Sequence, residues 1–191
     1  MDALKERILR EGRVRPGNIL KVDSFLNHQI DVAVLKEIGE EFHRIFGGLP
    51  ITKILTIESS GIAVACMTAQ SFGVPVVFAK KAQTKNLDGS LYRSIVRSYT
   101  YGKVYDVVLS KRFLGPEDHV LIVDDFLANG CAAEGLIDII GQAGASLEGV
   151  GIVIEKGFQE GGKMLREKGV NLHSLAIIES MTDNAVVFRE E

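Results

Sequence analysis

The chain has 191 residues, which fits one domain with a sizeable hydrophobic core, and its 46% apolar and 25% charged residues are ordinary for a globular protein. A net charge of −3 disfavours a nucleic-acid binder, which needs a clustered basic face. No apolar run reaches the ~20 residues of a membrane span, no secretory signal stands out and only Cys66 and Cys131 carry thiols, so we expect a cytoplasmic protein without nucleic acid or membrane as partner.

The first thirty residues predict a helix followed by an irregular segment. Leu4 and Ile8 lie one turn apart in a helix over 1–11, and Pro16-Gly17 predicts a turn. Residues 19–30 keep neither helical nor strand periodicity and are rich in apolar and amide side chains. Such a segment is either a packed surface loop or a lid over a ligand, and the residues alone leave both open.

A first strand–loop–helix unit follows a long amphipathic helix. Asp31 can cap this helix, which is expected to run to Phe46. The unit then has a strand over 53–57 and a helix over 62–72. Between them, the hydroxyls of Ser59 and Ser60 either cap the helix or, with free backbone N–H groups, hold an anion.

The region from 75 to 110 predicts a strand and then a hairpin. The strand over 75–79 is expected to end at Lys80-Lys81, which start a solvated loop or, at the ligand-binding edge of a sheet, meet an anion; Lys81 is the candidate. Two strands, over 93–101 and 104–109, predict a hairpin around Gly102. We expect residues 82–110 to form a flexible excursion from the core sheet.

The central feature of the sequence is a second strand–loop–helix unit. Residues 120–123 predict a buried parallel strand, with Asp124 and Asp125 where it ends. A loop of small residues then opens a helix that stops at Gly144. The helix N-terminus suits a phosphate, which small side chains let approach, while the two acids suit ribose hydroxyls one sugar away. The alternative is a Rossmann-like strand with two acids at its edge, although no Gly-rich nucleotide fingerprint or P-loop is present.

This layout resembles the phosphoribosyl-diphosphate motif of the type I phosphoribosyltransferases. The family often has Thr in the loop, where this chain has Ala128, Asn129 and Ala132, so phosphate contacts are expected from the backbone. Residues 19–30 resemble the N-terminal part of the bacterial members that act on xanthine, and the resemblance runs from end to end. It implies an α/β fold with a twisted, mainly parallel sheet flanked by helices, a base-binding hood over 1–30 and a hairpin hood over 82–110.

The same resemblance implies a reaction and a set of site residues. Xanthine and 5-phosphoribosyl 1-diphosphate would give xanthosine 5′-monophosphate and pyrophosphate in a homodimer, with Mg²⁺ bound to the diphosphate and no metal ligand from the protein. Asp124 and Asp125 would be catalytic. The expected contacts are Leu20, Asn27, Phe126 and Lys156 for xanthine; Ala128, Asn129, Gly130, Cys131 and Ala132 for the 5′-phosphate; and Ser59, Ser60 and Lys81 for pyrophosphate.

Three further observations bear on the choice of base and of class. Lys156, at the end of a strand over 149–154, is either solvated or a donor, and a donor favours a 6-oxopurine over adenine. Many 6-oxopurine members carry an Asp where Ala128 stands, so the sequence shows no general base. A guanine or hypoxanthine transferase therefore stays open, as does a non-catalytic sensor of phosphoribosyl diphosphate, although the first helix is too short for the DNA-binding segment that such regulators append.

Overall fold

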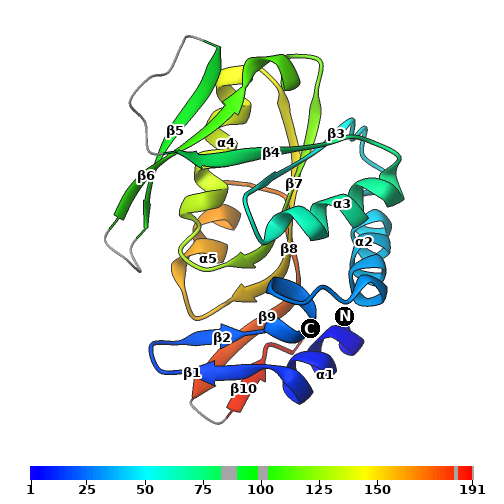
Figure 1. The fold of residues 1–191 in the computed structure, drawn as a ribbon, viewed down its shortest axis with the longest axis vertical. Helices are drawn as coiled ribbons and strands as arrows, with labels where there is room; N and C mark the ends of the chain where they lie inside the picture. The colour runs from blue at the N-terminus through cyan, green and yellow to red at the C-terminus, as the bar shows by residue number, and fades with distance from the viewer. Residues whose placement is uncertain (83–89, 99–102, 183–184, 191) are drawn as a thin grey trace.

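The computed structural model describes residues 1–82, 90–98, 103–182 and 185–190 (Figure 1). Within these residues an eight-stranded sheet has the order β10-β9-β8-β7-β3-β4-β6-β5. The strands from β9 to β4 are parallel, and antiparallel partners flank them on both sides. The strands are β3 (Lys53–Ile57), β4 (Val76–Ala82), β5 (Leu91–Ser98), β6 (Lys103–Ser110), β7 (His119–Leu127), β8 (Ser146–Lys156), β9 (Leu172–Thr182) and β10 (Ala185–Phe188).

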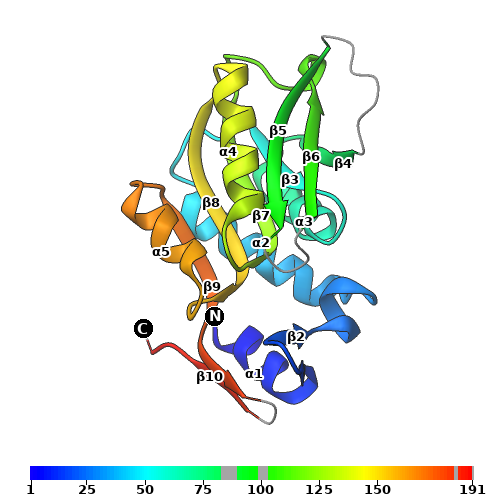
Figure 2. The ribbon, with the colours of Figure 1, turned by 90° about the vertical axis from the view of Figure 1, so that its left-hand side faces the viewer.

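Helices cover both faces of this sheet. Figures 1 and 2 show α2 (Val32–Phe46) and α3 (Gly61–Phe72) on one face and α4 (Cys131–Ala143) and α5 (Glu160–Glu167) on the other. Near one end of the sheet lie α1 (Asp2–Glu11) and an antiparallel ribbon of β1 (Arg13–Arg15) and β2 (Ile19–Lys21). Short turns of π-helix (Asp23–Asn27) and 3-10 helix (Lys111–Phe113) complete the described elements.

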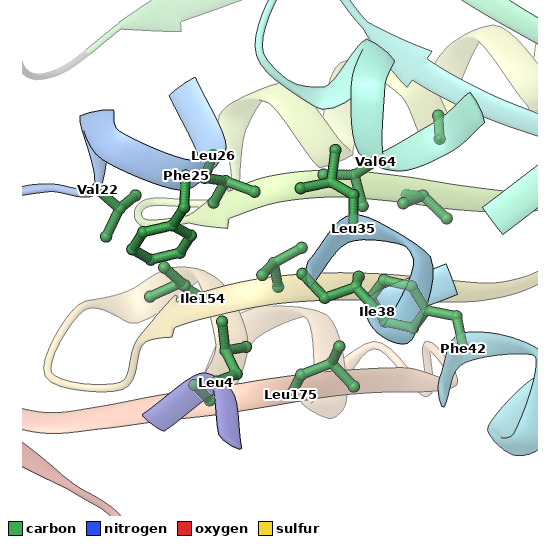
Figure 3. Close-up of a cluster of buried hydrophobic side chains, with 14 of the residues drawn as sticks. Leu4, Val22, Phe25, Leu26, Leu35, Ile38, Phe42, Val64, Ile154 and Leu175 are labelled. Atoms are coloured by element: carbon green, nitrogen blue, oxygen red, sulfur yellow. The ribbon is translucent and has the colours of Figure 1, made fainter. Parts of the chain in front are cut away.

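The helical pattern of the sequence explains why α2 packs as it does. Asp31 caps it by accepting hydrogen bonds from the N–H groups of Ala33 (3.1 Å) and Val34 (3.4 Å). Its buried residues recur at helical spacing and face the sheet, whereas the opposite side is charged. Figure 3 shows how this stripe meets side chains from α1, α3, the π-helical turn and the sheet, in a core that includes Leu4, Phe25, Leu35, Ile38, Phe42, Val64, Ile154 and Leu175.

The predicted fold class is confirmed, as are the predicted helices near 1–11, 31–46, 62–72 and 131–144. The sequence also predicts a short helix over 161–168, which is confirmed as α5. Two predicted strand ends are wrong. β7 continues through Asp124 to Leu127, because β8 keeps pairing with it beyond Ile122, where the pairing of β7 with β3 ends. β4 continues through Lys80 and Lys81, because β6 pairs with it there.

The predicted hairpin is confirmed, and its strands β5 and β6 pair along their whole length. It continues the central sheet rather than leaving it, since β6 also pairs with the end of β4. The sequence also predicts turns over 85–89 and at Asp183-Asn184. These two turns and the predicted turn at Gly102 lie outside the described residues. The irregular character predicted for 19–30 also holds, with three residues of strand and five of π-helix in that span.

Candidate active site

Two strand–loop–helix units leave neighbouring strands toward opposite faces of the sheet. β3 leads into α3 on one face, and the adjacent β7 leads into α4 on the other (Figures 1 and 2). The gap outside the carboxyl ends of two such strands is a topological switch point, where open α/β sheets bind ligands. Pairing between these strands stops at Leu55 and Ile122, so the residues just beyond line this gap.

The acidic pair occupies the gap. Oδ1 of Asp124 accepts a hydrogen bond of 3.0 Å from the backbone N–H of Asp125. Asp125 itself is 9% exposed. Burial raises the pKa of Asp124 well above the usual carboxyl value, and the charge of Asp125 raises it further. Burial also raises the pKa of Asp125. The Lys81 ammonium, the cation that faces the pair, opposes both shifts.

The loop that follows β7 holds the N-terminus of α4 without a side-chain cap. Gly130 stands at the N-cap with φ of 83°, a left-handed conformation that favours glycine. The first backbone N–H groups of α4 are therefore left for a ligand. With Tyr105 of β6 and residues of β7 and β8, the loop lines a cavity of about 150 Å³.

Helix α5 supports this loop from behind. The N–H of Gly161 donates to the carbonyl of Ala128 at 3.0 Å, and a Cβ on Gly161 would lie 2.5 Å from the nitrogen of Gly130. A Cβ on Gly130 would lie 2.7 Å from Cε of Met164. From the sequence, the small residues of this loop were expected to let the anion approach. For Gly130 this is corrected, because the missing side chain makes room for α5.

The loop that follows β3 carries hydroxyls and lies near a lysine. Ser60 is the N-cap of α3, yet its side chain makes no capping hydrogen bond. The peptide between Glu58 and Ser59 is cis. Glu58 accepts the backbone N–H of Lys81 at 2.7 Å, which ties the loop to β4. The Lys81 ammonium lies 5.6 Å from the ring centre of Tyr105, a residue that lines the cavity, whereas the ammonium of Lys80 lies over the ring of Phe78.

Lys156, at the end of β8, joins the N-terminal segment to this edge of the sheet. Its ammonium donates to the carbonyl of Asn18 at 2.9 Å and lies 6.0 Å from the ring centre of Phe126. Lys156 is half-buried, which lowers its pKa. Among the residues that the structure describes, Oδ1 of Asn27 is buried without a hydrogen-bond partner, so the amide group is left for a ligand. Leu20 is buried in the core beside Gly12.

Tyr105 and Glu155 gave no signal in the sequence, whereas Cys131 was expected at the loop. Tyr105 comes from the hairpin and lines the cavity, and burial raises the pKa of its hydroxyl. Burial also raises the pKa of Cys131, so its thiol stays protonated and is a poor nucleophile. Glu155 is buried behind Lys156, where Arg166 of α5 donates to both of its oxygens at 2.7 Å.

Among the described residues, no three His, Cys, Asp or Glu side chains gather where they could hold a metal ion. Asp124 lines the cavity at the uncapped N-terminus of α4, which suits a ligand that brings its own phosphates and cation.

Comparison with solved structures defines the class. The adenine phosphoribosyltransferase of Giardia lamblia, complexed with 9-deazaadenine, matches with a TM-score of 0.74 at 28% identity, covering 88% of this chain and 90% of that one. The adenine phosphoribosyltransferase of Leishmania tarentolae matches with a TM-score of 0.77 at 20% identity, covering 95% and 90%. The fold is that of a type I phosphoribosyltransferase.

Comparison with curated proteins defines the family. The chain is 60% identical over 191 residues to the xanthine phosphoribosyltransferase of Lachnoclostridium phytofermentans, covering 99% of this chain and 98% of that protein. It is 58% identical over 190 residues to the xanthine phosphoribosyltransferase of Ruminiclostridium cellulolyticum, covering 100% of both. The chain belongs to the xanthine phosphoribosyltransferase family, which confirms the resemblance seen in the sequence. No family model matches the chain.

Proposed function

We propose that this protein transfers the 5-phosphoribosyl group from 5-phosphoribosyl 1-diphosphate to xanthine, releasing xanthosine 5′-monophosphate and pyrophosphate. The observation that carries the proposal is the placement of Asp124 and Asp125 between two helix N-termini that lack side-chain caps. Two anion sites on either side of two carboxylates suit a sugar with phosphate groups at both ends. The names of the curated relatives supply xanthine as the base.

The sugar and its 5′-phosphate belong to the β7–α4 unit. The phosphate would accept hydrogen bonds from the backbone of the loop formed by Ala128, Asn129, Gly130, Cys131 and Ala132. Asp124 and Asp125, once ionised, would accept the ribose hydroxyls. Their negative charge would also favour the positive charge that develops on the ring as the leaving group departs.

The leaving pyrophosphate belongs to the β3–α3 unit. Ser59 and Ser60 would donate hydroxyl and backbone hydrogen bonds to it, and Lys81 would neutralise part of its growing charge. Mg²⁺ bound to the diphosphate would supply the rest of that neutralisation. The lysine already faces the acidic pair from β4, so a short movement of its side chain would reach the diphosphate.

The base would lie between the N-terminal segment and the end of β8. Phe126 offers a ring face, and Leu20 and Asn27 come from the segment above it. Lys156 has three donors and uses one on Asn18, so it can also donate to the C6 oxygen of a purine. Because the sequence shows no general base for the purine, we propose that xanthine, an acidic purine, binds as its anion with Lys156 as the stabilising cation.

We also propose a homodimer in the cytoplasm. Phe78 (39% exposed), Ile95 (62%) and Phe113 (55%) expose large apolar side chains at the β4–β6–β5 end of the sheet. An apolar area of this kind suits contact with a second subunit. Among the described helices, none is long and apolar enough to cross a membrane.

Pyrophosphate release with xanthine, phosphoribosyl diphosphate and Mg²⁺ tests the proposal, with guanine and hypoxanthine measured under identical conditions. We expect turnover with all three 6-oxopurines and the highest kcat/KM with xanthine. A protein that binds phosphoribosyl diphosphate but releases no pyrophosphate with any base would be a sensor. A preference for guanine or hypoxanthine would keep the reaction and overturn the choice of base.

A further inference from the structure

A buried hydroxyl without a partner lies beside the acidic pair. Thr56 of β3 is 0% exposed, and its Oγ1 makes no hydrogen bond within the described part of the chain. Buried hydroxyls are nearly always paired, because burying one alone is costly. Thr68 of α3 shows the ordinary arrangement, since its equally buried hydroxyl donates to the carbonyl of Val64 at 3.0 Å.

Gly61 brings this hydroxyl and Asp124 together. A Cβ on Gly61 would lie 2.3 Å from Oγ1 of Thr56 and 2.5 Å from Oδ1 of Asp124. Both oxygens are therefore within 2.5 Å of one point, at the start of α3. Any larger residue would push them apart, whereas glycine lets the hydroxyl and the carboxylate face the same small space.

Asp124 has few other groups that could stabilise its negative charge. Its Oδ1 accepts one hydrogen bond, from the N–H of Asp125, and Lys81 acts on it from β4. The remaining titratable groups around it do not favour a carboxylate, because they are acidic or neutral: Asp125 on its own strand, Glu58 before α3, Tyr105 from β6 and Cys131 from α4.

We propose that Thr56 is a positioning residue for Asp124, whose carboxylate accepts the Thr56 hydroxyl once it is ionised. The proposal rests on the proposed function, because it needs Asp124 to hold the ribose hydroxyls in its ionised form. A small rotation of either side chain makes the bond. A hydroxyl that donates to a carboxylate favours the ionised form and fixes its orientation, so the substrate meets an acceptor that is already charged and aimed.

The test compares Thr56→Val, which has nearly the same shape without the hydroxyl, with Thr56→Ser, which keeps the hydroxyl. Thr68→Val is the matched control, because it removes an equally buried hydroxyl that faces away from the site. The measurement is kcat/KM for phosphoribosyl diphosphate against pH, divided by the wild-type value at each pH. This ratio cancels the titration of xanthine and of the diphosphate.

For Thr56→Val we expect the acidic limb of the kcat/KM profile to move to higher pH by about one unit. At pH values below the limb, kcat/KM should be about tenfold lower than that of the wild type, and the difference should shrink at higher pH. Thr56→Ser and Thr68→Val should follow the wild type. A Thr56→Val profile that superimposes on the wild type, or that falls equally at every pH, would overturn the proposal. If the valine variant does not fold, Thr56→Ala must show the same shift. Wild-type protein without turnover would instead refute the proposed function.

Discussion

The two strand–loop–helix units at the switch point hold their helix N-termini in different ways. The β7–α4 loop has only small side chains and a left-handed glycine, and it packs against α5. The β3–α3 loop has two hydroxyls, a helical N-cap residue and a carboxylate that ties it to β4. Neither N-cap donates or accepts through its side chain, so both units leave backbone N–H groups for a ligand.

The difference fits two phosphate groups with different roles. A 5′-phosphate keeps its charge through the reaction, so a rigid cradle of backbone donors is sufficient. A leaving pyrophosphate gains charge as its bond breaks, so hydroxyls and a cation close to it lower the barrier. We therefore assign the packed loop to the group that stays and the polar loop to the group that leaves.

The largest expected effect comes from the acids between the two loops. Changing Asp124 or Asp125 to Ala should lower kcat by about a hundredfold or more, because charge stabilisation in the transition state is lost while both loops still bind. Thermal unfolding should show a folded protein, since these acids face the ligand gap. Asp138→Ala, an exposed acid on α4, is the control. Unchanged kinetics in either variant would remove that acid from the site.

The residues proposed to contact the base, Asn27 and Lys156, belong to neither loop. Changing them should therefore alter the choice of base without altering the phosphate sites. Asn27→Ala should weaken use of xanthine more than of guanine, because we propose that the NH2 group of its amide donates to the C2 oxygen of xanthine, which guanine lacks. A lost buried hydrogen bond of ~1–3 kcal/mol corresponds to roughly ten- to hundredfold in kcat/KM. Lys156→Ala should weaken all 6-oxopurines alike. Equal losses for every base in Asn27→Ala would leave that residue a packing role.

Moving the packed loop should affect phosphoribosyl diphosphate alone. In Gly161→Ala the new Cβ would lie 2.4 Å from the carbonyl oxygen of Ala128, so the loop must shift. We expect KM for phosphoribosyl diphosphate to rise by about tenfold and KM for xanthine to change little. Gly141→Ala places the same methyl group in open space on α4 and should leave both constants unchanged. Equal changes in the two variants would count against a supporting role for α5.

The smallest expected effect comes from the polar loop. Ser60→Ala removes one hydroxyl and should weaken product inhibition by pyrophosphate by about two- to tenfold, the usual range for a single hydrogen bond. Inhibition by xanthosine 5′-monophosphate should not change, because its phosphate lies on the other loop. Ser71→Ala, whose hydroxyl bonds within α3, is the control. If Ser60→Ala weakened inhibition by pyrophosphate and by xanthosine 5′-monophosphate alike, the assignment of the two loops would be wrong.

Local patterns were enough to predict the elements that carry these loops. The helices show apolar spacing with Asp31 at one start and Gly73 and Gly144 at two ends, and the acids stand directly after an apolar run. The ends of β4 and β7 were missed because they depend on partners: β6 prolongs one and β8 the other. A strand cannot signal in its own sequence how far its neighbour runs.

The rest of the site depends on contacts across long stretches of sequence. Lys156 reaches Asn18 over 138 positions, and Thr56 becomes significant only because β3 lies beside β7. A single threonine in an apolar strand looks like any strand residue, and Tyr105 looks like an ordinary member of a hairpin. The direction of the Gly130 Cβ, toward α5 rather than the anion, likewise requires the packing of a helix thirty residues further along.

The most direct test of the central claim is a crystal structure of the protein with xanthosine 5′-monophosphate and pyrophosphate bound. We predict the nucleotide phosphate on the backbone N–H groups of residues 129–132, the ribose hydroxyls on Asp124 and Asp125, and pyrophosphate on Ser59, Ser60 and Lys81. A nucleotide phosphate on the β3–α3 loop, or ribose hydroxyls that contact neither acid, would contradict the account.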